Sequence, residues 1–212
     1  MSGFERFNKI LNLFSEKRSS LTVAEISEEL KIPSSTIYRT VREMVLADFL
    51  ESAAGSYFRL GQAFIKFNRI INLSDPLIQA GEPFLKKLAN ENPIPSTNIL
   101  ARLFGDKVMC VADFKYPSFK NNTSYQKGRL MPLLYGATSR AIIMQIKGKR
   151  LSRILNLEGL NDDKEQKIFI SGLDKDKNKG FCKTEGQVDN GLIGFATSIN
   201  NKKLGIEASL SS

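Results

Sequence analysis

The residues best suited to chemistry in this sequence lie on one stretch near its amino-terminal end. Ser35, Tyr38, Arg39 and Arg42 recur at i, i+3, i+4 and i+7, a spacing that places side chains on one face of an α-helix. An arginine can form two hydrogen bonds to a guanine in the major groove of DNA, and hydroxyl groups can bind bases or phosphates. The amino end of such a helix also favours a phosphate. This face therefore predicts contact with double-stranded DNA.

The rest of the sequence offers little for catalysis or metal binding. It contains no histidine, which removes the commonest general base and a usual zinc ligand. Its two cysteines, Cys110 and Cys182, are too far apart to predict a zinc site or a disulfide framework, and both are expected to be reduced. No glycine-rich phosphate-binding motif occurs. We therefore expect no catalytic residues, no cofactor and no metal ion.

Two helices are expected before the DNA-facing one. The first is predicted by apolar side chains that share a helical face, namely Phe4, Phe7, Leu11 and Phe14. The second opens with a capping box, in which the Thr22 hydroxyl and the Glu25 carboxylate each bind the other residue's backbone amide. It ends before Pro33, because the residue preceding a proline is disfavoured in a helix.

The third helix is expected over residues 33–46, and its second face is apolar: Ile37, Val41, Met44 and Val45. Two short alternating runs around Gly55 follow and predict a β-hairpin. This order of elements is typical of a winged helix-turn-helix domain, which we place at residues 1–62. Its candidate DNA-binding residues are Thr22, Ser34, Ser35, Thr36, Tyr38, Arg39, Arg42, Tyr57 and Arg59.

The net charge of +9 favours a polyanionic partner, but the charge is not concentrated in this domain. Residues 1–69 hold ten Lys and Arg against eight Asp and Glu, whereas residues 120–183 hold fourteen against six. The position of the arginines on one helix face is thus stronger evidence for DNA binding than the net charge.

The sequence shows no signal peptide and no apolar run of membrane-spanning length, so a cytoplasmic protein without a membrane partner is expected.

Over nearly its whole length the sequence resembles the IclR (isocitrate-lyase regulator) family of transcriptional regulators. The segment SLTVAEISEELKIPSSTIYRTVREMVLADFLES and the later SYFRLGQAF are similar to the family's DNA-binding domain. TNILARLFGDKVMCVADF, RLMPLLYGATSRAIIMQI and GLIGFATSINNKKLGIEASLSS are similar to segments of its second domain. The first of these segments also predicts two strands joined by a two-residue turn at Gly105-Asp106. The resemblance implies an α+β chain with a linker helix at 63–78 and a GAF-like antiparallel sheet flanked by helices at 79–212.

The resemblance also implies that the second domain binds a small organic effector, often a carboxylate or an aromatic acid, and forms dimers or tetramers on palindromic operators. The corresponding effector-binding residues are Leu133, Gly136, Ala137, Glu185, Gly194 and Ser209. Free amides where Gly136 opens a helix could hold a carboxylate. Small residues there could equally serve close packing on a sheet. Ser139-Arg140 stands where the family usually has Gly-Lys, which puts the identity of the ligand in question.

Two functions remain open from the sequence. The first is a sequence-specific DNA-binding transcriptional regulator whose operator affinity depends on a small organic effector. The second is a protein-interaction or assembly module that uses its winged helix for docking and has no ligand response. Arg39, Arg42 and Arg59 separate these possibilities, because an operator requires the cations and docking would tolerate their loss.

Overall fold

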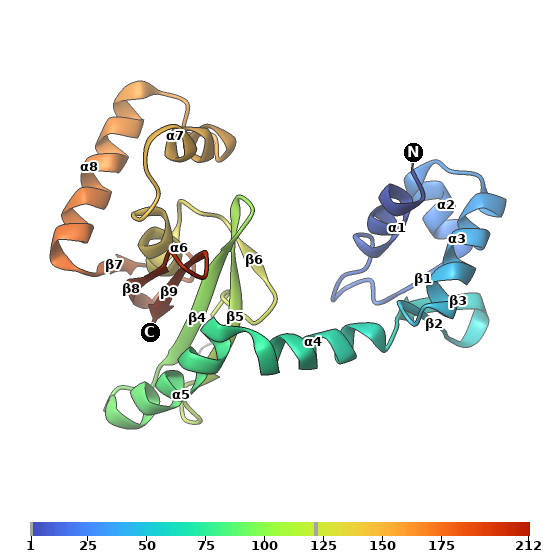
Figure 1. The fold of residues 1–212 in the computed structure, drawn as a ribbon, viewed down its shortest axis with the longest axis horizontal. Coiled ribbons are helices and arrows are strands. Elements are labelled where there is room, and N and C mark those ends of the chain that lie inside the picture. Colours follow the sequence, from blue (N-terminus) through green and yellow to red (C-terminus); the bar gives the residue numbers. More distant parts are fainter. Residues whose placement is uncertain (1, 121–122) are drawn as a thin grey trace. The chain divides into compact units, whose positions relative to one another are not determined.

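The structure is a computed structural model that describes residues 2–120 and 123–212. Contacts divide the chain into two compact units, residues 1–74 and residues 75–212, and each is described by itself. The predicted α+β class is confirmed, with a helix-turn-helix unit first and a curled antiparallel sheet second (Figure 1). Within the described ranges, every helix is too short or too polar to span a bilayer.

Three helices form the body of the first unit: α1 (Gly3–Leu11), α2 (Val23–Leu30) and α3 (Ser34–Leu46). Their inward faces share a core that includes Ile10, Ile26, Ile37 and Val41. α1 ends earlier than the apolar spacing suggested. Phe14 lies beyond the helix and packs on the same core from the following turn.

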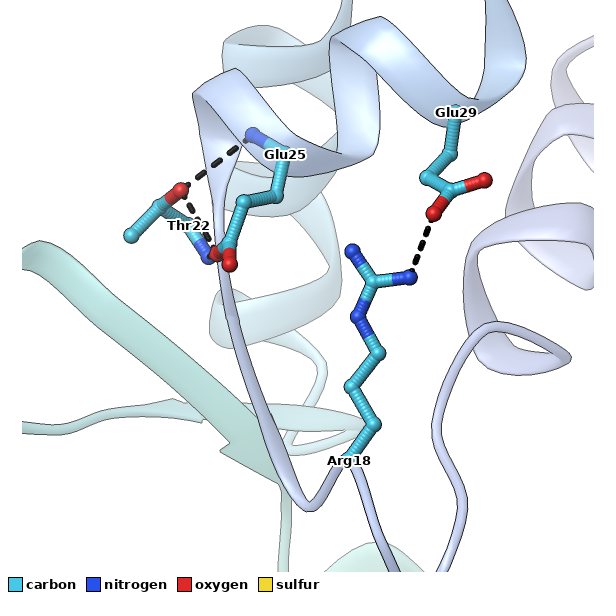
Figure 2. A network of polar contacts seen from close by, with 4 residues as sticks. All are labelled: Arg18, Thr22, Glu25 and Glu29. Carbon is cyan, nitrogen blue, oxygen red and sulfur yellow. Dashed lines mark hydrogen bonds and ion pairs between the residues drawn. The ribbon is translucent and has the colours of Figure 1, made fainter.

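The predicted capping box at the start of α2 is present. The Glu25 amide donates to the Thr22 hydroxyl over 3.2 Å, and the Thr22 amide donates to the Glu25 carboxylate over 2.7 Å (Figure 2). These bonds satisfy backbone amides that the first turn of a helix leaves without partners. Nearby, Arg18 is paired with Glu29 at 2.6 Å (Figure 2).

The wing is a three-stranded sheet and not the simple hairpin that the sequence suggested. Its strands are β1 (Ser20–Thr22), β2 (Leu50–Ser52) and β3 (Tyr57–Leu60), in the order β1-β3-β2. The short helix η1 (Ala54–Ser56) turns the chain between β2 and β3, with Gly55 at φ +70°. β1 was not predicted because three residues are too few to show an alternating pattern.

After the wing, α4 (Ala63–Ser74) completes the first unit. Phe64 and Phe67 of α4 contact Phe49 with ring centroids 5.7 and 6.2 Å apart. The helix ends where Asp75 caps the next one, α5 (Pro76–Glu91). The linker expected at 63–78 therefore corresponds to α4 together with the first residues of α5.

The second unit is built on a six-stranded antiparallel sheet of order β6-β5-β4-β9-β8-β7. The strands are β4 (Thr97–Phe104), β5 (Lys107–Lys115), β6 (Leu130–Met131), β7 (Cys182–Glu185), β8 (Ile193–Asn201) and β9 (Ile206–Ser211). The predicted two-residue turn at Gly105-Asp106 joins β4 and β5, with Phe104 paired to Lys107.

Helices cover both faces of this sheet. Leu85 of α5 packs with Leu100 and Ala208 on one face. The other face carries α6 (Gly136–Ile143), α7 (Gly148–Leu157) and α8 (Asp163–Lys179), and α8 leads into β7 (Figure 1). Because successive strand residues point to opposite faces, Ile99 joins the α6 side while Leu100 joins the α5 side.

Candidate nucleic-acid interface and ligand cavity

The outer face of α3 combines exposure with positive charge. Ser35, Tyr38, Arg39 and Arg42 are all exposed, and Tyr38 retains 59% of its accessible surface. No described residue forms an ion pair with either arginine. The opposite face is buried through Ile37 and its neighbours, so this helix has only one side available for a partner. The structure therefore brings together the four residues whose spacing predicted a DNA-facing surface.

The start of α3 adds backbone donors to this face. Ser34 and Ser35 are its first two residues, and the amides of a first helical turn have no acceptor within the helix. The cap position is Pro33, which offers no side-chain acceptor for them. Amides at such a helix start suit a phosphate oxygen.

Other predicted contact residues already have partners inside the unit. Ser34 donates to the Ser27 hydroxyl at 3.0 Å, and Ser27 donates to the Ile32 carbonyl at 2.6 Å, so both hydroxyls brace the turn between α2 and α3. The Thr22 hydroxyl donates to Glu25 at 2.8 Å. Thr36 is half-buried and its carbonyl accepts from Thr40 at 3.1 Å. These residues shape the helix-turn-helix more than they present free polar groups.

The wing supplies one further cation. Arg59 lies on β3 directly opposite Glu51 of β2, and the two side chains form an ion pair. Tyr57, at the start of β3, keeps 39% of its surface exposed. The wing thus presents an aromatic ring and a guanidinium, but the charge of Arg59 is shared with a carboxylate, unlike those of Arg39 and Arg42.

A cavity of about 400 Å³ lies in the second unit, on the α6 side of the sheet. It is bounded by the start of α6, the ends of β4, β8 and β9, and the loops that contain Tyr125 and Asp189. Most of its wall is apolar. A concave apolar site with a few polar groups is typical of small-molecule binding.

Three of the six residues predicted to bind an effector line this cavity: Gly136, Ala137 and Gly194. Gly136 adopts φ +79°, and a Cβ atom there would lie 2.8 Å from Cγ2 of Val188, so only glycine fits. A Cβ on Gly194 would lie 3.3 Å from that of Ala137. Gly194 therefore allows α6 to approach β8 closely, and Gly136 allows it to approach the loops that contain Val188 and Tyr125.

The other three predicted residues do not line the cavity. Leu133 is fully buried in the core beneath α6. Ser209 is also buried and donates to the Thr138 carbonyl at 3.0 Å. Glu185 is the exposed last residue of β7. Its strand continues because residues 182–185 pair with β8.

Several cavity residues were missed by sequence reasoning, notably Thr97, Tyr125 and Asp189. Tyr125 is buried, which raises the pKa of its phenol, and its hydroxyl lies 2.8 Å from that of Ser139. Asp189 accepts from the amide and hydroxyl of Ser124 at 2.8 and 2.6 Å. Only the inward alternation of β4 could have indicated Thr97, since the others lie in loops without periodicity.

Nothing in the described residues suggests metal or thiol chemistry. They contain no group of three His, Cys, Asp or Glu side chains placed to hold a metal ion. Cys110 and Cys182 are free and buried, and burial raises the pKa of each thiol to about 12. Such thiols are protonated at neutral pH and react slowly.

Together, the exposed cationic face of α3 and the wing define a DNA-binding protein of the winged helix-turn-helix class. Residues 5–53 match the family model of the IclR helix-turn-helix domain. Residues 5–53 therefore form an IclR-type helix-turn-helix domain. Among curated proteins, it is 18% identical over 204 residues to the Pca regulon regulatory protein of Pseudomonas putida, covering 94% of this chain and 69% of that protein.

Solved structures show the same fold over the whole chain. An IclR transcriptional regulator from Alicyclobacillus acidocaldarius is 21% identical, with a TM-score of 0.81 and coverage of 99% of this chain and 86% of that one. An IclR homolog from Microbacterium hydrocarbonoxydans, complexed with 4-hydroxybenzoate, is 20% identical, with a TM-score of 0.79 and coverage of 100% and 88%. At sequence identities of 21% and 20%, this structural similarity establishes the fold alone.

Proposed function

We propose that this regulator reads an operator through α3 and that a small organic molecule in the cavity modulates its affinity for DNA. The first part of this proposal rests on Arg39 and Arg42. Both guanidinium groups lie on the exposed side of α3, opposite the face buried through Ile37, and no described residue forms an ion pair with them. Major-groove DNA offers guanine and phosphate acceptors that suit them.

The residues of the α3 face divide by position. Arg39 lies about one turn from the amino end of the helix, where recognition helices meet base edges, and is assigned base recognition. Arg42, Ser35 and the wing residues Tyr57 and Arg59 are assigned to the phosphate backbone. Thr22, Ser34 and Thr36 hold the helix-turn-helix in shape beneath these contacts. The DNA-binding domain of this proposal comprises residues 1–62.

The regulator is proposed to act as a homodimer or homotetramer on a palindromic site. A single recognition helix reads only a few base pairs, and paired half-sites separated by a whole number of DNA turns, about 10 base pairs each, extend the sequence read. α4 offers an apolar surface for this assembly, because Ile65, Ile70, Ile71 and Leu73 are each at least half exposed. A protein that acts on the chromosome in this way works in the cytoplasm.

The effector site is proposed to be the cavity against α6. Its support is threefold: the cavity is apolar and concave, the predicted effector residues Gly136, Ala137 and Gly194 line it, and a structurally similar IclR homolog was solved with 4-hydroxybenzoate. A ligand there contacts α6, both neighbouring loops and the sheet, so it can favour one arrangement of this domain over another.

Selection of bound fragments from the source genome tests the DNA-binding part directly. Wild-type protein should enrich a small set of fragments that share a two-fold-related sequence. The double variant R39A/R42A should enrich none, whereas Arg153→Ala, which removes an exposed cation from α7, should behave as wild type. Equal enrichment by wild type and the double variant would reject α3 as the DNA-reading element.

A further inference from the structure

The polar groups that line the cavity point to the charge of its ligand. Among the described residues that line the cavity, Asp189 is the only one whose side chain is charged at neutral pH. No lysine or arginine is among them. Partial burial acts to raise the pKa of Asp189, but hydrogen bonds from Ser124 and Thr123 and the positive charge of Arg129 outweigh it, so the pKa lies below its ordinary value. The fixed charge of the wall is therefore negative.

The backbone amides at the start of α6 could offset the negative charge of Asp189, but one of them already has an acceptor. The amide of Gly136, first in α6, donates to the side-chain carbonyl of Gln187 at 3.2 Å. A carboxylate at this position would have to displace Gln187 and would meet no cation in the described wall. Burying an anion without a cation is costly, because it loses its hydration and gains only dipoles in return.

One hydroxyl in the same wall has no partner. Thr97 is only 8% exposed, and its Oγ1 atom forms no hydrogen bond with any described residue. Alternation along β4 places Thr97 on the α6 side with Ile99, while Asn98 turns to the opposite side and donates to the Leu85 carbonyl at 3.0 Å. A buried hydroxyl without a partner is rare in proteins.

Other hydroxyls of the cavity wall are hydrogen-bonded to one another and not to Thr97. The hydroxyls of Thr138 and Ser211, which also line the cavity, lie 2.8 Å apart. Ser212 donates to Ser96 at 3.0 Å. Thr97 is thus a free donor and acceptor in a wall where the hydroxyls of Thr138 and Ser211, and those of Ser96 and Ser212, are paired with each other.

We propose that the effector is an uncharged, mainly apolar molecule whose single hydroxyl or carbonyl oxygen binds Thr97, and not an organic anion. This inference rests on the proposed effector function of the cavity and replaces the carboxylate that the family resemblance implied. The apolar wall takes the body of the molecule, Thr97 fixes its orientation, and the negative charge of Asp189 disfavours carboxylates.

Calorimetric titration of the full chain with matched pairs of probes tests the proposal. The pairs are 4-hydroxybenzamide with 4-hydroxybenzoate, and benzyl alcohol with benzoate, which differ little in size but differ by one charge. The neutral member of each pair should bind at least about tenfold more tightly. Thr97→Val, which removes the hydroxyl at nearly constant volume, should weaken neutral binding about fivefold to tenfold, whereas Thr97→Ser should retain it.

Thr197→Val serves as the control, since Thr197 is exposed and lies outside the cavity wall. Tighter binding of the acids would overturn the neutral-ligand inference while upholding an effector site. Equal neutral binding by wild type and Thr97→Val would overturn the role of Thr97. If no probe binds although the protein still enriches genomic fragments, the effector site itself is rejected and the DNA-binding function stands.

Discussion

At the scale of single residues, the candidate DNA contacts differ in how far their polar groups are already used. Arg39 and Arg42 are exposed and have no ion-pair partner among the described residues, whereas Arg59 is bound to Glu51. A cation that is paired in the free protein must exchange one anion for another when it binds phosphate. We therefore expect α3 to contribute more to DNA affinity than the wing does.

Glu51→Gln should strengthen DNA binding. The substitution frees Arg59 and removes a negative charge that faces the phosphates, so affinity for specific and random DNA should both rise, by about threefold at low salt. Fluorescence anisotropy with labelled duplexes measures this. Arg59→Ala is the matched variant and should weaken both affinities. A decrease in affinity for Glu51→Gln would show that the pair is needed to build the wing.

Thr22→Ala should destabilise the first unit by about 1 kcal/mol, because the helix loses the hydroxyl that caps its first turn. Thr22→Ser keeps that hydroxyl and should remain close to wild type. Urea unfolding followed by circular dichroism provides the comparison. If Thr22→Ala instead unfolds like wild type but loses DNA affinity, the residue contacts DNA and is not mainly a cap.

At the scale of elements, α4 divides into two parts. Phe64 and Phe67 contact Phe49 of the winged helix, while Ile70, Ile71 and Leu73 remain exposed further along. The first half of α4 therefore uses its aromatic side chains to pack on the winged helix. Its second half is what the proposed assembly would bury.

Ile71→Lys should weaken self-association at least about tenfold, since it places a charge within the proposed apolar contact. Light scattering at micromolar concentration should show an oligomer for wild type and mainly monomer for the variant. Gln62→Lys adds the same charge just before α4 and serves as the control. A wild-type protein that is monomeric with and without DNA would remove α4 as an assembly element.

Asp189 links two loops of the cavity wall through Thr123 and Ser124. Because its folded pKa lies below the unfolded value, the link stabilises the fold above that value and is lost as pH falls through the folded pKa. Wild type should thus melt above Asp189→Asn at pH 6–7, and the difference should shrink below about pH 4. A constant difference across this range would exclude the carboxylate as its origin.

The elements that the sequence predicted well are those with strong local signals. Apolar spacing, the Thr22–Glu25 capping box and the turn at Gly105 each depend on residues close together in the chain, and the structure contains all three. β1 was missed because it is short and gains its stability only by pairing with β3.

The cavity could be predicted only in part, because several of its residues come from distant segments of the chain. Gly136, Ala137 and Gly194 follow from segments similar to the family, but Thr97, Tyr125 and Asp189 come from parts of the chain that only folding brings together. Whether a residue lines a cavity or packs beneath it, as Leu133 does, depends on that packing.

At the scale of the whole molecule, the proposed function requires that the cavity and α3 influence each other. A compound that binds the cavity should change DNA affinity by a coupling free energy of about 1–3 kcal/mol. Linkage makes this reciprocal, so operator DNA should change affinity for the compound by the same factor. Titrating the compound with and without DNA measures both. Binding of the compound with no change in DNA affinity would contradict a regulatory role for the cavity.

The central claim is that α3 reads DNA, and one set of binding measurements tests it most directly. Wild type, Arg39→Ala and Arg42→Ala are titrated with the selected operator, its single-base variants and random duplex across a salt series. Arg39→Ala should lose about 1–3 kcal/mol of discrimination at one base pair per half-site. Arg42→Ala should weaken all sequences alike and reduce the salt slope by about one ion per site. Unchanged affinity and salt dependence in both variants would contradict the account.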